Sequence, residues 1–152
     1  MTQLRRVGFA AGGSLALLLG AFAFQHLGGL APCKMCIWQR YPHVIAIALG
    51  ALFFFVPSSI LLGLGALAAL TTAGIGVYHV GVEQKWWEGP ATCTGGDVST
   101  LNADDLFNQI MAAPLVRCDD IAWSLGGISM AGWNAIISLL LAAFWIAAIK
   151  RS

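Results

Sequence analysis

Charged side chains are scarce in this sequence. Only 10% of the 152 residues are Asp, Glu, Lys or Arg, whereas a soluble globular domain carries about 25%. Hydrophobic residues make up 59% of the chain, and its mean hydropathy is +0.79. A soluble fold could not keep so much apolar surface away from water. The composition therefore excludes an ordinary soluble domain and favours a single membrane domain over residues 1–152.

Several cofactor motifs are also missing. No nucleotide or flavin motif is present, and Ile37 follows Cys36 where a haem attachment site would have histidine. A zinc site usually presents two closely spaced ligand pairs. Cys33 and Cys36 form one such pair, but Cys93 and Cys118 are 25 positions apart. We therefore predict no metal site, and we expect no nucleic-acid partner.

Long apolar runs are what the chain has instead. A membrane-crossing helix needs about 20 predominantly apolar residues. Runs at about 7–27, 60–80 and 128–149 reach this length without a charged side chain. A span at about 37–56 must include Arg40, whose long stem can reach the headgroups, and it places Pro42 near the helix start. The sequence thus predicts an all-α membrane protein, a bundle of four transmembrane helices.

The distribution of charge predicts the orientation of these spans. The basic residues at the two ends of the chain are Arg5, Arg6, Lys150 and Arg151. The stretch 81–127 holds seven acidic residues against two basic ones. Because positive residues favour the cytoplasmic side, we expect both termini in the cytoplasm of a bacterium. Loops at about 28–36 and 81–127 then face the periplasm from the inner membrane. The first run could instead be a signal peptide cleaved after Ala23, which would leave the loops on the same side.

All four cysteines fall in the two predicted periplasmic loops. They are Cys33 and Cys36 in the first loop, and Cys93 and Cys118 in the second. Disulfides persist in the periplasm, so an even number on one side suggests two redox-linked pairs. Four cysteines allow three pairings. The short spacing favours Cys33 with Cys36, which leaves Cys93 with Cys118.

The first pair has the C-x-x-C spacing of disulfide oxidoreductases. The thiolate is the reactive species, and nearby cations lower the pKa of a thiol. Arg40 lies four residues after Cys36, so on a helix the two share a face. Arg40 can therefore stabilise a thiolate of Cys36 or an anionic adduct formed on it. A structural bridge remains the alternative for each pair.

One further element is predicted in the second loop. Residues 102–112 place Leu106, Phe107, Ile110 and Met111 on one side of a helix. This pattern predicts a short amphipathic helix lying on the membrane surface. Such a helix would tether the loop and keep Cys93 and Cys118 close to the first pair.

With these residues in view, the chain resembles the DsbB family, the disulfide bond formation proteins of bacterial inner membranes. The likeness covers nearly the whole chain, including the predicted span that follows directly on the C-x-x-C motif. The residues that carry it are Pro32, Cys33, Cys36 and Arg40, then Ala91, Thr92 and Cys93, and finally Cys118 and Trp123. Each motif alone is common, but their combination and order are specific.

The resemblance implies a thiol:quinone oxidoreductase. A reduced periplasmic thiol oxidase similar to DsbA would be reoxidised through Cys93 and Cys118. Electrons would pass to Cys33 and Cys36 and then to a membrane quinone, ubiquinone or menaquinone, bound near Arg40.

The resemblance also implies a histidine near the quinone. His79 is the candidate, with Glu83 four residues further on, although its spacing to Cys93 differs by one residue from the family pattern. Two alternatives stay open: a relative that serves a dedicated thiol partner, and a non-enzymatic membrane scaffold with two structural disulfides.

Overall fold

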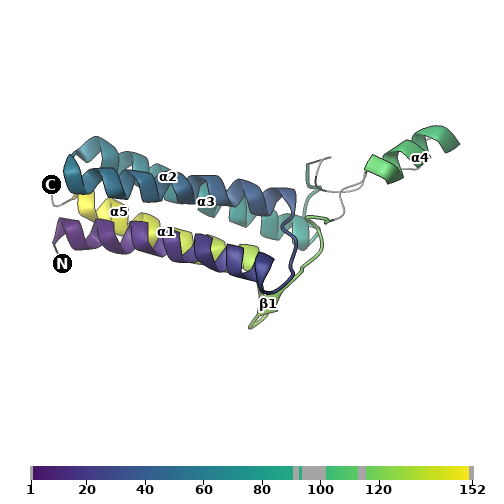
Figure 1. The fold of residues 1–152 in the computed structure, drawn as a ribbon, viewed down its shortest axis with the longest axis horizontal. Coiled ribbons are helices and arrows are strands. Elements are labelled where there is room, and N and C mark those ends of the chain that lie inside the picture. The colour runs from purple at the N-terminus through teal and green to yellow at the C-terminus, as the bar shows by residue number, and fades with distance from the viewer. Residues whose placement is uncertain (1, 91–92, 94–101, 113–115, 151–152) are drawn as a thin grey trace.

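The computed structural model describes residues 2–90, 93, 102–112 and 116–150. Four long helices run side by side as an elongated bundle (Figure 1). They are α1 (Gln3–His26), α2 (Lys34–Phe55), α3 (Ser59–Glu83) and α5 (Met130–Ile149). Each helix packs against two neighbours, in the cyclic order α1, α2, α3, α5. The predicted all-α helical bundle is confirmed in these residues.

Each long helix begins after a residue whose side chain accepts a backbone N–H of the first turn. Such caps satisfy donors that have no partner within the helix. Thr2, Ser58 and Ser129 do this through hydroxyl oxygens at the starts of α1, α3 and α5. The cap of α2 is a thiol, because Cys33 Sγ accepts from the N–H of Cys36. The hydrogen bond that caps the start of α2 therefore also links the two cysteines of the C-x-x-C motif.

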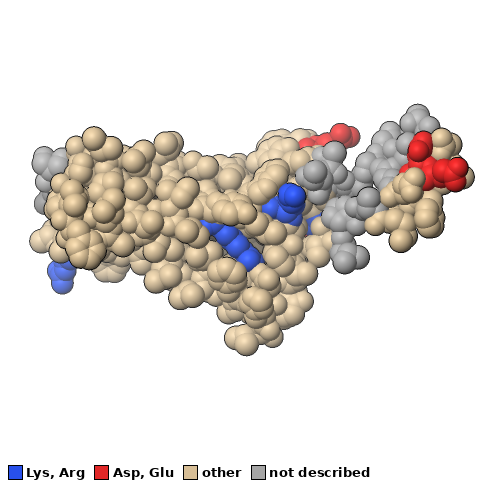
Figure 2. Space-filling view, turned by 45° about the horizontal axis from the view of Figure 1, so that its top comes forward, with Lys and Arg blue, Asp and Glu red and all other residues tan. Residues whose placement is uncertain are grey.

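Three helices, α1, α3 and α5, are long and apolar enough to cross a membrane. On the face drawn in Figure 2, the half of the bundle toward the termini is free of charged side chains except at its tip, whereas basic side chains are visible nearer the loop end. The helix α2 does not reach the same mean hydropathy, because Lys34, Gln39 and Arg40 stand in its first two turns. The fourth predicted span stays a prediction.

The start of α2 differs from the sequence-based expectation. The helix begins at Lys34, three residues before the predicted start, so Pro42 lies inside it. The expectation that Pro42 stands near the helix start is therefore wrong. The thiol cap on Cys33 explains the difference, because it allows the helix to begin directly after the first cysteine. Cys36 consequently lies in the first helical turn.

The half of the bundle near the termini is packed around Trp145, which is fully buried. Side chains from all four long helices surround it, including Val7, Phe53 and Leu62. Gly65 of α3 lies directly against the indole, where an added Cβ would meet Trp145 Cδ2 at 2.6 Å. Small residues of this kind let helices approach closely in lipid.

We expect Gly65→Ala to lower the free energy of unfolding by about 1–3 kcal/mol, because the methyl group would overpack a rigid, buried indole. The matched control is Gly63→Ala on the same helix, where an added Cβ meets nothing within 4 Å. That variant should gain up to about 1 kcal/mol from helix propensity. Unfolding in detergent, followed by circular dichroism, measures both. Equal stability of the two variants would contradict this packing.

Both termini lie at the same end of the bundle (Figure 1). The amide of Gln3 donates to the carbonyl of Ala148 at 3.2 Å, and the guanidinium of Arg6 donates to the carbonyl of Ala147. The α1–α2 connection and the segments between α3 and α5 lie at the opposite end (Figure 1). The two regions that carry cysteines therefore share one end. Arg151 lies outside the described residues.

The predicted helix of the second loop is confirmed as α4 (Ala103–Ala112). Phe107 and Met111 are 63% and 71% exposed, so these two side chains of the apolar side do not pack on the bundle. The side chains of Leu106 and Ile110 lie outside the described part of the chain. Whether α4 rests on a membrane stays a prediction.

A small hairpin precedes α5 and was not predicted. It pairs β1 (Ser124–Leu125) with β2 (Ile128–Ser129) in antiparallel register. Gly126 and Gly127 connect the strands with φ of 61° and 78°. Positive φ at both loop positions is the requirement of a type I′ turn, which favours glycine. The Gly-Gly pair was the sequence signal for this hairpin.

Candidate functional site

The structure brings the four cysteines together at one end of the bundle. Cys33, Cys93 and Cys118 belong to one buried apolar cluster, and Cys36 packs against it. Cys93 and Cys118 are fully buried, and Cys33 is 4% exposed. The backbone N–H of Cys118 donates to the carbonyl of Cys93 at 3.0 Å, which joins the two parts of the second loop. Ala91 and Thr92, which precede Cys93 in the family motif, lie outside the described residues.

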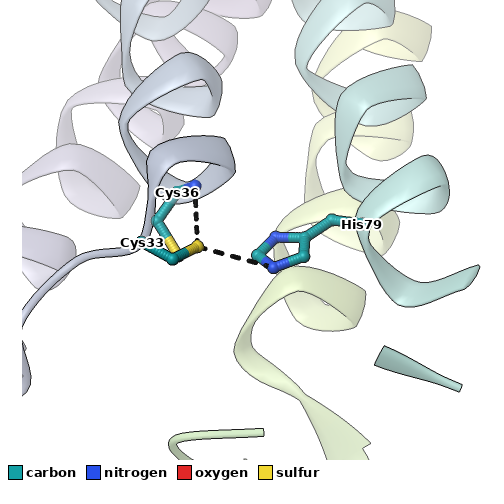
Figure 3. A group of neighbouring side chains, drawn as sticks. All are labelled: Cys33, Cys36 and His79. Atoms are coloured by element: carbon teal, nitrogen blue, oxygen red, sulfur yellow. Dashed lines mark hydrogen bonds between the residues drawn. The ribbon is translucent and has the colours of Figure 1, made fainter. Parts of the chain in front are cut away.

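The two thiols of the C-x-x-C motif are in direct contact (Figure 3). Their Sγ atoms are 2.7 Å apart, and the N–H of Cys36 donates to Cys33 Sγ at 3.2 Å. Cys33 caps α2 and Cys36 lies in its first turn, so the start of the helix sets their separation. A bond between these sulfurs can form and break without a large movement of the backbone.

The two thiols differ in acidity. The pKa of Cys36 is lowered, chiefly because Cys33 S–H donates a hydrogen bond to its sulfur, and Arg40 adds a smaller electrostatic contribution. Burial and the charge of Glu83 oppose this shift. The pKa of Cys33 is raised, because its proton is held in the bond to Cys36 and because it is buried. Cys36 is therefore the more acidic thiol of the reduced pair.

We expect alkylation of reduced Cys36 by iodoacetamide to reach its maximal rate at a lower pH than alkylation of free cysteine does. Only the thiolate reacts, and a lowered pKa keeps Cys36 ionised at lower pH. A Cys93→Ser/Cys118→Ser background leaves one pair to label, and mass spectrometry of the labelled peptide gives the rate at each pH. A midpoint at or above that of free cysteine would contradict the assignment.

Arg40 is held by two residues of α1. Its Nη1 donates to Gln25 Oε1 at 2.7 Å, and the guanidinium carbon lies 4.9 Å from the centroid of the Phe22 ring. Both contacts fix the direction of the charge. The sequence predicted Arg40 but not its partners on α1. Gln25 offered a signal, as a polar side chain near the end of an apolar run.

His79 connects α3 to both cysteine regions, and Figure 3 shows its contact with the first of them. Its Nε2 lies 3.6 Å from Cys33 Sγ and 3.2 Å from the carbonyl oxygen of Cys118. Glu83 Oε1 is 3.8 Å from the same nitrogen. The sequence-based choice of His79 as a site candidate therefore corresponds to a buried residue in contact with the first cysteine.

These groups also have the composition of a metal site. The donor atoms of Cys33, Cys36 and His79 all lie within 4.8 Å of one another. Zinc in proteins takes four ligands, or three and a water. The absence of a metal site stays a prediction.

A cavity of about 530 Å³ opens beside the two thiols. That size is typical of sites for small organic ligands. Its lining is mostly apolar and comes largely from α1 and α5, with Gly13, Gly20 and Trp133 among the residues that form it. Cys36 and Arg40 line it as well, together with other polar residues, which are Cys33, Gln39, His43, His79, Glu83, Arg117, Asp120 and Asn134. The arrangement places a thiol and a guanidinium in the wall of a largely apolar space.

A second polar group lies deeper in the bundle and was not predicted from the sequence. Gln39 and His43 of α2, Thr72 of α3 and Asn134 of α5 bond to one another and to His79. Three different helices supply these residues, and only Asn134 stands alone in an apolar run, since Gln39 adjoins Arg40 and Thr72 adjoins Thr71.

Comparison with known proteins gives one consistent result. The family model described as disulfide bond formation protein DsbB matches residues 5–148. A disulfide bond formation protein B of Pasteurella multocida is 36% identical, over 91% of this chain and 84% of its own length. Proteins of that description from Verminephrobacter eiseniae and Aromatoleum aromaticum are 34% and 35% identical, each over 90% of this chain and over 80% and 92% of their own lengths. No solved structure matches the chain.

Proposed function

The chain belongs to the DsbB family of disulfide-generating oxidoreductases, and on that premise we propose that it oxidises a periplasmic thiol oxidase similar to DsbA and passes the electrons to a membrane quinone. The observation that carries this proposal is the meeting of the four cysteines at one end of the bundle, where three are buried in one cluster and Cys36 packs against it. Structural disulfides would not require the two pairs to meet. A relay between them does.

The second-loop pair is the entry point in this proposal. A thiolate of the reduced partner attacks one sulfur of a Cys93–Cys118 disulfide, and the partner's second thiolate then resolves the mixed disulfide. The partner leaves oxidised, with Cys93 and Cys118 as thiols. These exchange with a Cys33–Cys36 disulfide by the same chemistry, so Cys33 and Cys36 become the reduced pair. Two electrons and two protons move in each exchange.

The residues around the cavity fit a quinone as the final acceptor. A quinone, when bound, accepts two electrons and two protons and leaves as the quinol while the Cys33–Cys36 disulfide re-forms. Cys36 holds the thiolate in the wall of the cavity, and Arg40 supplies positive charge there. The buried Nε of Arg40 has no hydrogen-bond partner among the described atoms, which leaves a donor for a ligand oxygen. The apolar lining suits an isoprenoid tail.

We further propose that the whole chain is one four-span domain, with both termini in the cytoplasm and the cysteine loops in the periplasm. At about 1.5 Å per residue, the 22 residues of α2 measure about 33 Å, enough for the hydrocarbon core. The termini share one end of the bundle, and in Figure 2 acidic side chains are visible only toward the loop end. This distribution supports the proposed orientation.

The test is anaerobic quinone reduction by the purified protein in detergent, with reduced thiol oxidase as donor and ubiquinone or menaquinone as acceptor. Turnover with either quinone is the expected result. If dithiothreitol supported turnover but reduced general thiol oxidases did not, the result would favour a dedicated thiol partner instead. A folded protein that fails with every donor and both quinones would favour the scaffold with structural disulfides.

A further inference from the structure

Four polar residues lie inside the apolar bundle below the cysteines. Gln39, His43 and Thr72 are 6%, 3% and 0% exposed, and Asn134 reaches them from α5. Polar side chains at such positions are costly unless they are hydrogen-bonded, and in membrane proteins they mark functional sites. These four bond to one another and, through Gln39, to His79.

Thr72 sets the direction of the hydrogen bonds. Its hydroxyl lies 3.0 Å from the backbone carbonyl oxygen of Gln39, which can only accept. The single hydroxyl hydrogen is therefore used, and Thr72 Oγ1 must accept from its other neighbours. These are Asn134 Nδ2 at 3.1 Å and His43 Nε2 at 3.3 Å. The amide nitrogen of Asn134 thus faces Thr72, and its Oδ1 accepts from His43 Nε2 at 2.9 Å.

Gln39 continues the same donor-to-acceptor order of hydrogen bonds as far as His79. Asn134 Nδ2 also donates to Gln39 Oε1 at 2.7 Å, so the amide nitrogen of Gln39 points the other way. That nitrogen lies 2.9 Å from His79 Nδ1 and 3.4 Å from the carbonyl oxygen of Met35. The Met35 carbonyl can only accept, which agrees independently with a donating Gln39. His79 Nδ1 is therefore an acceptor.

The other nitrogen of His79 agrees with this assignment. A neutral imidazole carries one hydrogen, so a Nδ1 that accepts leaves the hydrogen on Nε2. The nearest oxygen to Nε2 is the carbonyl of Cys118 at 3.2 Å, again a group that only accepts. Cys33 Sγ is at 3.6 Å, and the carboxylate of Glu83 is further away at 3.8 Å. The backbone carbonyl oxygens of Gln39, Met35 and Cys118 can only accept, and all three contacts agree with a hydrogen on Nε2 of His79.

We propose that Asn134 and Gln39 are positioning residues that hold His79 in the tautomer with its hydrogen on Nε2. A one-way chain of hydrogen bonds then runs from His43 through Asn134, Gln39 and His79 to Cys33, whose own hydrogen faces Cys36 at 2.7 Å. Bonds aligned in one direction polarise and strengthen one another. The chain stabilises the thiolate of Cys36 from inside the bundle, and its value for turnover rests on the proposed function.

The same tautomer makes His79 a hydrogen-bond donor to the reduced cysteines rather than a base that removes their protons. It also disfavours metal binding. A histidine that ligates a metal through Nε2 carries its hydrogen on Nδ1 and donates it to an acceptor. Here Nδ1 accepts a hydrogen bond from the amide of Gln39, and this contact favours the opposite tautomer, with the hydrogen on Nε2.

Nuclear magnetic resonance of the full chain with ¹⁵N-labelled histidine tests the assignment directly. The chain has three histidines, and His79→Ala identifies the signals of His79 by their loss. We expect a protonated Nε2 and an unprotonated Nδ1 for His79. In Gln39→Glu the carboxylate can only accept, so the hydrogen should move to Nδ1. A parent ring with its hydrogen on Nδ1, or a Gln39→Glu ring unchanged, would overturn the proposal.

A second readout uses a neutral variant. Asn134→Ala frees the Gln39 amide to rotate, so His79 should show both tautomers. The equilibrium between the Cys33–Cys36 pair and dithiothreitol, measured in a Cys93→Ser/Cys118→Ser background, should shift toward the disulfide by about tenfold, or about 30 mV. Ser138→Ala is the matched control, because it removes a buried hydroxyl one turn from Asn134 that has no partner among the described atoms.

An unchanged tautomer and an unchanged equilibrium in Asn134→Ala would assign Asn134 a purely structural role and overturn the proposal. The same shift in Ser138→Ala would do so too, because it would show a general effect of loosening α5. Neither measurement requires a quinone or a protein donor. Failure of this inference is therefore distinguishable from failure of the proposed function.

Discussion

Replacing Cys33 or Cys36 by serine is expected to reduce quinone turnover by on the order of 10³-fold or more, whichever thiol donor is supplied. The relay has no route to the quinone without both sulfurs of this pair. Cys36 carries the thiolate beside the cavity, and Cys33 completes the disulfide that lets the electrons leave. Stopped-flow or steady-state absorbance of the quinone measures the loss.

Serine at Cys93 or Cys118 should give a different pattern. These variants should fail with the protein donor, because the proposed entry pair is broken. A small dithiol should still drive turnover, since Cys36 is partly exposed and can be attacked directly. The roles of the two pairs are thus distinguished by which electron donor still supports turnover, and not by how much turnover falls.

Each variant needs a control for folding, because Cys33, Cys93 and Cys118 are buried together. Circular dichroism and size-exclusion chromatography in detergent should match the parent. If Cys93→Ser retained full turnover with the protein donor, electrons would enter elsewhere, and the two-pair relay would be wrong. If Cys36→Ser retained it, the pair beside the cavity would not be the exit.

The bundle was predictable because each of its helices is determined by residues that are close together in the sequence. An apolar run of about 20 residues can satisfy its backbone in lipid only as a helix, so α1, α3 and α5 follow from composition alone. The contact between Cys33 and Cys36 is equally local, because the two residues are three positions apart at the start of a helix. The start of α2 was missed because a thiol cap is not a usual helix-start signal, although Cys33 fills the role that Ser or Thr fills elsewhere.

The contacts that give the site its chemistry were not predictable in the same way. His79 is 46 positions from Cys33, and Asn134 is 95 positions from Gln39. In sequence, His79 and Asn134 are each one polar side chain in an apolar run. Which of them meet depends on the rotation of three helices about their axes, and that rotation is set by packing, for example of Gly65 against Trp145. The sequence could predict which residues lie near the cysteine end of the bundle, but not which of them are in contact.

Removal of the charge of Arg40 is expected to slow the reaction with quinone and to spare the exchange of thiols. Arg40→Met keeps the length of the side chain but removes a cation that contributes to the lowered pKa of Cys36. Preorganised positive charge at a site of developing negative charge is worth on the order of 10²-fold in rate. We expect a loss of that order in kcat/KM for quinone, with reduction of Cys33–Cys36 by dithiothreitol changed far less.

Two further substitutions separate the charge of Arg40 from its orientation. Arg40→Lys keeps a positive charge but not the planar guanidinium that Gln25 and Phe22 hold in place, so it should recover only part of the loss. Gln25→Leu keeps the guanidinium and removes its hydrogen-bond partner on α1, and should show a smaller defect than Arg40→Met. If Arg40→Met and Gln25→Leu had equal effects, orientation alone would account for the role of Arg40. If Arg40→Met left quinone kinetics unchanged, the acceptor would have to bind away from the Cys36 end of the cavity, and the proposed quinone site would be wrong.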